Sequence, residues 1–132
     1  MRLHHVGIIT DDVKSAIQRH KALFKLHPIT KVVHDTNQKV AVVLLSTPER
    51  EGVPIELIAP LTKDSPVSSA LKRGTRLYHI CFEVDDIEKA LDSARKQGAI
   101  VVSPPSQAKL YKGRRIAFIY TRDKCLVEFL EK

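Results

Sequence analysis

The 132-residue sequence contains no tryptophan, a single methionine and only 5% aromatic residues. Its longest unbroken apolar run, residues 40–45, is far shorter than the roughly 20 residues that a membrane-spanning helix requires. The N-terminal residues also lack the apolar stretch and the small-residue cleavage site of a secretory signal. We therefore expect a cytoplasmic protein without a membrane partner.

Cysteine is equally scarce. Cys81 and Cys125 are the two cysteines, and neither belongs to a CxxC motif. In a reducing compartment such residues are typically free thiols rather than a disulfide. Because both fall at predicted strands, we expect two free and buried thiols.

The charge is unbalanced but scattered. Twenty-two Lys and Arg residues face 15 Asp and Glu residues, which gives a formal net charge of +7. Nucleic-acid binding is not expected, because aromatic residues are few and the basic residues do not gather in one segment. A small anionic molecule, such as a phosphate-bearing thioester, accounts for the same charge.

The sequence contains an internal duplication. Residues 3–13 return as residues 77–87, with Leu, His and two Asp matching at a constant offset of 74 residues, and residues 54–58 resemble residues 126–130. Each half therefore has a His near its start and a Glu near its end. Two His and two Glu form the nitrogen and oxygen ligand set that a divalent transition metal prefers. The four residues are His5, Glu56, His79 and Glu128.

Each half predicts the same order of elements. Apolar and β-branched runs indicate strands, and apolar residues at helical spacing after Asp-Asp indicate capped helices. In the first half we expect strands at 3–10, 29–33, 40–46 and 54–59, with a helix over 13–24. A short helix after Ser65 bridges the halves. In the second half we expect strands at 77–84, 100–103, 116–121 and 126–130, with a helix from 87 until Gly98 stops it.

The predicted fold class is α+β. Two tandem βαβββ modules, residues 1–60 and 77–132, are joined by a linker at 61–76. Modules of this size are marginal alone, so we expect one domain over residues 1–132 with a shared core. The modules should form a curved mixed sheet with the helices on its outer face.

Strand alternation separates the chemistry from the core, because successive side chains point to opposite faces. His5 and His79 fall on the face away from the helices, beside the small residues Gly7 and Cys81. The two Glu residues fall on that face as well. His4 lies on the core side and is interpreted as structural. Cys81 is either a small buried filler or a softer metal ligand.

Three segments resemble a known family, namely Ile55–Leu61, Asp64–Val67 and Tyr78–Ile87. With the paired modules, they resemble the vicinal oxygen chelate (glyoxalase/bleomycin resistance/dioxygenase) superfamily, and within it the methylmalonyl-CoA epimerases. The resemblance implies one divalent metal ion, either zinc, nickel, cobalt or manganese, and a homodimer. The ligands that it implies are His5, Glu56, His79 and Glu128.

The implied activity is a metal-dependent epimerisation of a 2-substituted acyl-CoA thioester through proton abstraction next to a polarised carbonyl. Glu128 would act as the base on one face of the substrate carbon, and Asp35 or His34 would act as the base on the other face. The family's carboxylate before the third strand has no Glu counterpart in residues 33–38. Two alternatives therefore stay open: a glyoxalase I-type lactoylglutathione lyase, and a non-catalytic small-molecule binding protein of the same superfamily.

A basic segment, residues 108–115, replaces the Gly-rich loop that the family carries before its seventh strand. One interpretation is a solvated turn. The other is that the segment binds the phosphates of a nucleotide-bearing substrate. The residues concerned are Lys109, Lys112, Arg114 and Arg115.

Overall fold

The computed structural model describes residues 1–132 and contains nine β-strands and three α-helices. The chain divides into two compact units. The N-terminal unit comprises residues 5–78, and the C-terminal unit comprises residues 79–132 together with residues 1–4. The expected linker, residues 61–76, thus belongs to the N-terminal unit. None of the helices is long and apolar enough to cross a membrane.

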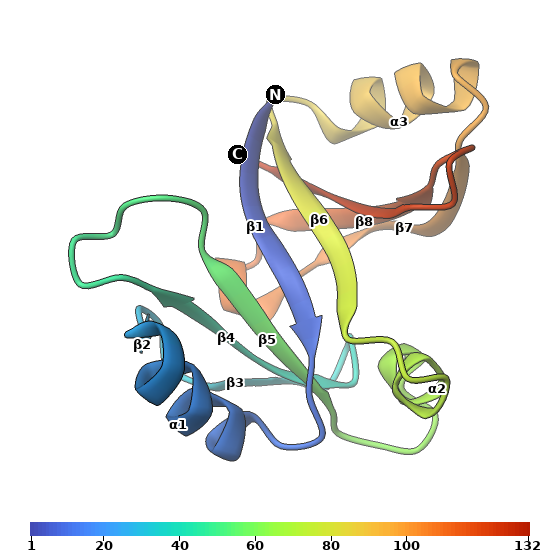
Figure 1. Ribbon diagram of the computed structural model, residues 1–132. Coiled ribbons are helices and arrows are strands. Elements are labelled where there is room, and N and C mark those ends of the chain that lie inside the picture. The colour runs from blue at the N-terminus through green and yellow to red at the C-terminus, as the bar shows by residue number, and fades with distance from the viewer. The chain divides into compact units, whose positions relative to one another are not determined.

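The N-terminal unit has one mixed sheet. Strand β1 pairs in parallel with β5, β4 pairs antiparallel with β5, and the short strands β2 and β3 both border β4. Figure 1 shows α1 lying along this sheet and α2 following β5. The elements are β1 (Arg2–Ile9), α1 (Val13–Phe24), β2 (His27–Pro28), β3 (Val33–Asp35), β4 (Val40–Ser46), β5 (Ile55–Pro60) and α2 (Pro66–Lys72).

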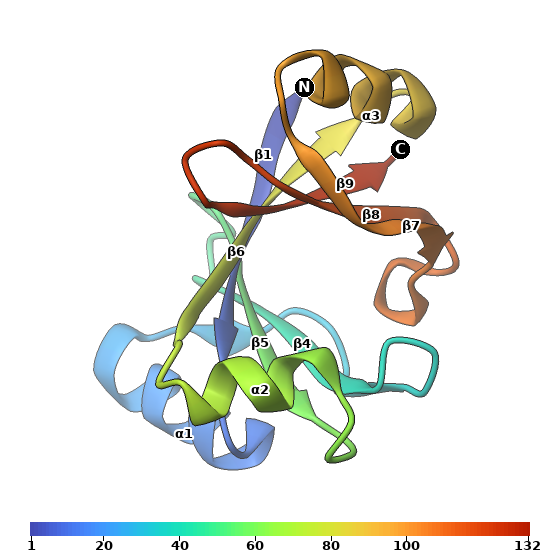
Figure 2. The ribbon, with the colours of Figure 1, turned by 90° about the vertical axis from the view of Figure 1, so that its right-hand side faces the viewer.

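The C-terminal unit repeats this arrangement. Strand β6 pairs in parallel with β9, β8 pairs antiparallel with β9, and β7 forms the edge beside β8. Figure 2 shows α3 on one side of these strands. The elements are β6 (Leu77–Val84), α3 (Ile87–Lys96), β7 (Ile100–Gln107), a 3₁₀ turn η1 (Lys109–Tyr111), β8 (Arg115–Tyr120) and β9 (Leu126–Glu131). The α+β class and the two βαβββ modules are confirmed.

Both major helices begin as the sequence predicts. Asp12 and Asp86 have extended backbone, with φ of −143° and −142°, and their carboxylates accept hydrogen bonds from the amides three residues later, at Ser15 and Lys89. The Ser15 hydroxyl, followed by the Ser15 amide, lowers the pKa of the Asp12 carboxyl, and the Lys89 amide lowers that of Asp86. The Asp-Asp pairs thus act as helix caps, as predicted.

Each unit has its own apolar core between its helix and one face of its sheet. In each unit the side chains that alternate with the His and Glu positions pack against the helix, as the strand alternation predicts. The buried core of the N-terminal unit consists of Val13, Ala16, Ala41, Val43, Leu45, Leu57 and Ala59. That of the C-terminal unit consists of Val84, Ile87, Leu91, Ala117, Ile119, Val127 and Phe129.

The strand expected at residues 29–33 was predicted wrongly, because residues 29–32 are not a strand. Two short strands, β2 and β3, flank this break. Pro28 has no amide hydrogen to donate to the sheet. The Leu44 amide donates to the Thr30 hydroxyl at 3.1 Å, so a side chain replaces a backbone acceptor of the ladder.

Strand β7 is longer than expected, since it continues past Ser103 to Gln107. Its pairing with β8 shifts register twice, between Val101 and Ser103 and between Ser103 and Ser106. Pro104 and Pro105 lie in the second shift. An edge strand tolerates proline, because its outward amides need no partner in the sheet.

An ion-pair cluster joins the end of β9 to the N-terminus of α3. Glu131 accepts hydrogen bonds from the Arg115 guanidinium at 2.8 and 2.9 Å and from the Ile87 amide at 3.0 Å. These bonds, that of Arg115 first, lower the pKa of Glu131 from 4.5. Because the folded state has the lower pKa, the ionised carboxylate stabilises the protein above pH 4.5. This stabilisation disappears as the pH falls through the folded-state pKa.

We expect Glu131→Gln to lower the free energy of unfolding at pH 7 by about 1–2 kcal/mol, because the Arg115 guanidinium loses its charged acceptor. Thermal unfolding of both proteins between pH 7 and pH 3 measures the effect. The difference in Tm should shrink below pH 4.5. A difference that stays constant over this range would contradict the assignment.

Candidate functional site

The N-terminal unit contains a buried His–Glu pair. Strands β1 and β5 are parallel neighbours, and Gly7 is the register partner of Glu56. His5 precedes Gly7 by two residues, so its side chain lies on the same face as that of Glu56. His5 Nε2 lies 3.6 Å from Glu56 Oε2, and their side chains are 0% and 7% exposed. Both residues lie within paired strands, so the sheet fixes the position of the pair.

The C-terminal unit contains the equivalent pair in the same register. Strands β6 and β9 are parallel, and Cys81, two residues after His79, is the partner of Glu128. His79 Nε2 lies 2.9 Å from Glu128 Oε2, and their side chains are 1% and 2% exposed. The Phe118 ring meets the His79 ring edge-on, with the centroids 5.4 Å apart.

These two pairs are chemically unusual for strand interiors. Burying a carboxylate is costly unless it is hydrogen-bonded, paired with a charge or bound to a metal. An imidazole nitrogen and a carboxylate oxygen are both common ligands of divalent transition metals. The nitrogen and oxygen donors of each pair therefore fit a metal of this class.

The two candidates for a second base lie on opposite faces of the N-terminal sheet. His34 is the register partner of Ala41, which belongs to the helix-side core. The adjacent Asp35 falls on the other face, which is that of Glu56. Asp35 is 3% exposed, and its Oδ1 accepts hydrogen bonds from the amides of Asn37 and Gln38 at 3.0 Å each. Of the two, only Asp35 shares the face of His5 and Glu56.

The four basic residues of segment 108–115 differ in their surroundings. Arg114 donates to Glu83 at 2.7 Å and to the Glu131 carbonyl at 2.6 Å. Arg115 binds the Glu131 carboxylate and also donates to Glu88 at 3.1 Å. Both guanidinium groups thus form ion pairs within the C-terminal unit. The remaining two side chains, Lys109 and Lys112, are exposed.

Glu83 is a buried carboxylate that the sequence interpretation missed. It lies on the same face of β6 as His79 and Cys81, is 8% exposed, and accepts hydrogen bonds from Arg2 at 2.9 Å and from Arg114. The Arg114 hydrogen bond is the main cause that lowers its pKa. The sequence signal that could have identified Glu83 is strand alternation, because residues 79, 81 and 83 point to the same face.

His4 is half-buried, and its ring meets the Tyr111 ring edge-on at a centroid distance of 5.6 Å. Neither cysteine forms a disulfide, as expected, and Cys81 is buried. The prediction that Cys125 is buried was wrong. It is exposed, because it lies in the turn before β9, where its amide donates to the Thr121 hydroxyl.

The model of the Glyoxalase/Bleomycin resistance protein/Dioxygenase superfamily matches residues 4–118. This chain belongs to that superfamily, which agrees with the paired βαβββ modules and the duplicated His–Glu pairs.

Three proteins that are similar to this chain cover most of its length. The ethylmalonyl-CoA/methylmalonyl-CoA epimerase of Cereibacter sphaeroides is 28% identical over 131 residues, covering 96% of this chain and 95% of the relative. The uncharacterized protein YqjC of Bacillus subtilis is 33% identical, covering 98% and 91%. The crystal structure of methylmalonyl-CoA epimerase from Mycobacterium tuberculosis superposes with a TM-score of 0.84 at 27% identity, covering 98% and 87%.

The different burial of the two thiols can be tested directly. A thiol reagent such as dithiobis(nitrobenzoic acid) should modify Cys125 in the folded protein, whereas Cys81 should react only after denaturation. Absorbance of the released thiolate measures both phases. Cys125→Ser is the control, and it should remove the fast phase alone. A fast phase that survives in this variant would contradict the burial of Cys81.

Proposed function

We propose that this chain is an isomerase that epimerises a 2-substituted acyl-CoA thioester by removing the proton next to the thioester carbonyl. The observation that carries the proposal is the buried His–Glu pair, which recurs in the same strand register in both units. The epimerase relatives, one of which aligns over 96% of this chain, support the substrate class.

The proposal includes one divalent metal ion, either zinc, nickel, cobalt or manganese. Each His–Glu pair contributes a nitrogen and an oxygen donor, which together suit such an ion. When bound, the ion supplies Lewis-acid polarisation of the thioester carbonyl, which makes the neighbouring C–H more acidic. The four residues assigned to hold it are His5, Glu56, His79 and Glu128.

Glu128 is assigned as the base that removes the proton. Its carboxylate is 2% exposed and lies 2.9 Å from His79 Nε2, so a strand and a hydrogen-bonding neighbour hold it in place. Epimerisation also requires proton delivery to the opposite face of the same carbon. Asp35 is assigned to that face, because it is the candidate that shares a sheet face with Glu56.

A second function is favoured by the surroundings of the two candidates for a second base. The Asp35 carboxylate already accepts the amides of Asn37 and Gln38, and protonation would weaken these bonds. His34 faces the helix side of its sheet. A glyoxalase I-type lyase that relies on the same His–Glu pairs is therefore the alternative activity. A binding protein of this superfamily without turnover would show neither reaction.

We predict that the purified protein binds one equivalent of a divalent metal and that His79→Ala loses most of it, because a ligand is removed. Elemental analysis gives the stoichiometry. His34→Ala is the control, since this exposed imidazole lies on the opposite face of its sheet, and it should keep the metal. Wild-type protein that stays metal-free after reconstitution would refute the metal assignment.

We predict that the wild-type protein exchanges the α-proton of methylmalonyl-CoA with deuterated solvent and that Glu128→Gln slows exchange by about 100-fold or more, because the base is lost. Proton NMR of the substrate measures this. Asp35→Asn should retain exchange from one epimer while slowing epimerisation. Metal binding without exchange, together with turnover of the glutathione hemithioacetal of methylglyoxal, would favour the lyase.

We also propose that Lys109 and Lys112, together with Arg114 and Arg115, attract the phosphates of the coenzyme A moiety. The lysines are the exposed members of the segment, whereas both arginines already bind carboxylates. The homodimer implied by the family resemblance stays a prediction.

Lys112→Ala should raise the KM for a coenzyme A thioester by about fivefold, because one exposed charge pair with a phosphate is lost. The kcat should stay unchanged. The KM for the N-acetylcysteamine thioester, which lacks phosphates, should not change. Lys124→Ala is a matched control, because this lysine is also exposed and has a similar positive φ, 62° against 56°. Equal effects on both thioesters would contradict phosphate binding.

A further inference from the structure

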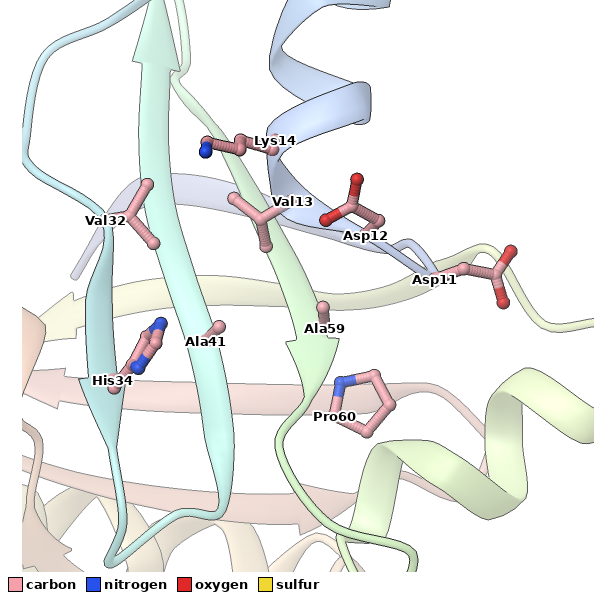
Figure 3. A pocket seen from close by; sticks show the side chains of 9 residues that line it. All are labelled: Asp11, Asp12, Val13, Lys14, Val32, His34, Ala41, Ala59 and Pro60. Carbon is pink, nitrogen blue, oxygen red and sulfur yellow. The ribbon is translucent and has the colours of Figure 1, made fainter.

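The helix side of the N-terminal sheet contains a cavity of about 460 Å³ next to the first turn of α1. Ala41 of β4 and Ala59 of β5 are register partners, and their small side chains form its floor. Figure 3 shows the surrounding side chains. The cavity lies on the opposite face of this sheet from His5 and Glu56, so it does not belong to the His–Glu pair. We call it the α1 cavity; its lining residues are Asp11, Asp12, Val13, Lys14, Val32, His34, Ala41, Ala59 and Pro60.

The internal repeat shows what occupies the equivalent place in the C-terminal unit. In each unit the strand that carries the buried Glu pairs antiparallel with a neighbour, β4 or β8. Counting three residues along both strands from the pair that contains the Glu leads to Ala41 and Ala59 in the N-terminal unit. The same count leads to Arg115 and Glu131 in the C-terminal unit.

The Glu131 carboxylate fills that place and binds the N-terminus of α3. It accepts the Ile87 amide at 3.0 Å and the Arg115 guanidinium at 2.8 and 2.9 Å. Arg115 also bridges to Glu88 at 3.1 Å. A carboxylate is thus stable beside the Asp-Asp cap when a cation accompanies it, since the positive end of the helix and the cation both favour its charge.

The N-terminal unit retains the recognition elements but lacks the carboxylate. Val13 occupies the position of Ile87, and Ala59 offers no acceptor to its amide. Lys14 occupies the position of Glu88, so the cation that Arg115 provides in the other unit comes here from the helix. Figure 3 shows Lys14 extending from α1 towards β4, with the Asp11 carboxylate directed away from the strands.

We infer that the α1 cavity binds a small carboxylic acid with an apolar body. Its carboxylate takes the place that Glu131 occupies in the other unit, accepting the Val13 amide and pairing with Lys14. Its apolar part lies on Ala41, Ala59 and Pro60. His34 lies exposed among the lining residues. The volume lies within the range of small-molecule pockets.

The proposal is tested with sodium benzoate added to the ¹⁵N-labelled protein, with sodium chloride at equal ionic strength as the reference. Saturable amide shifts should concentrate at residues 13–15 and at Ala41 and Ala59. Lys14→Met should weaken binding about fivefold, because the cation is lost. Lys21→Met is the control, since Lys21 lies in the last turn of α1, and its affinity should stay unchanged.

Two further variants fill the cavity. Ala59→Glu copies Glu131 of the other unit, so it should raise Tm and abolish benzoate binding, and Ala41→Leu should block binding sterically if the first variant does not fold. The proposal is refuted if benzoate causes no saturable shift at these amides. It is equally refuted if binding persists in a folded cavity-filled variant or is insensitive to Lys14→Met.

Discussion

The buried imidazole–carboxylate pair is the constraint around which each unit is organised. A His and a Glu can be buried together only if the backbone brings them within ion-pair distance, because an unpaired buried charge is costly. Parallel pairing of β1 with β5, and of β6 with β9, achieves this. The pleat then sends the alternate side chains to the helix side, where they build the core.

The two repeats have diverged around this shared arrangement. The C-terminal unit stabilises its helix and strand ends with ion pairs, in which Glu83 and Glu131 hold Arg2, Arg114 and Arg115. The N-terminal unit has alanines at the positions of Arg115 and Glu131 and consequently contains a cavity. A duplicated fold can therefore keep one set of positions in both halves while it changes others.

Part of the positive charge of the chain is neutralised by local ion pairs. A net charge of +7 suggests a surface that attracts anions, but several of the basic residues are already neutralised locally. Arg114 and Arg115 bind carboxylates, and the half-buried Lys39 pairs with Asp64 and lowers its pKa to about 2. The net charge therefore overstates how much positive charge the surface presents.

Periodicity alone could predict most of the fold. The caps at Asp12 and Asp86, both main helices and the strands around the His and Glu positions follow from local rules of spacing and alternation. Prediction failed where a local rule competes with tertiary contact. Pro28 and the Thr30 hydroxyl divide one expected strand in two, and β7 continues through two prolines because it lies at an edge.

The sequence by itself determined which polar residues recur in both halves, because the duplication marks one His and one Glu in each half without reference to structure. Only the tertiary structure decided how they are paired, since strand register depends on neighbours distant in the chain. It also separated Asp35 from His34, and the structural arginines from the exposed lysines. Ion pairs across 16 to 81 residues of chain leave no local pattern in a sequence.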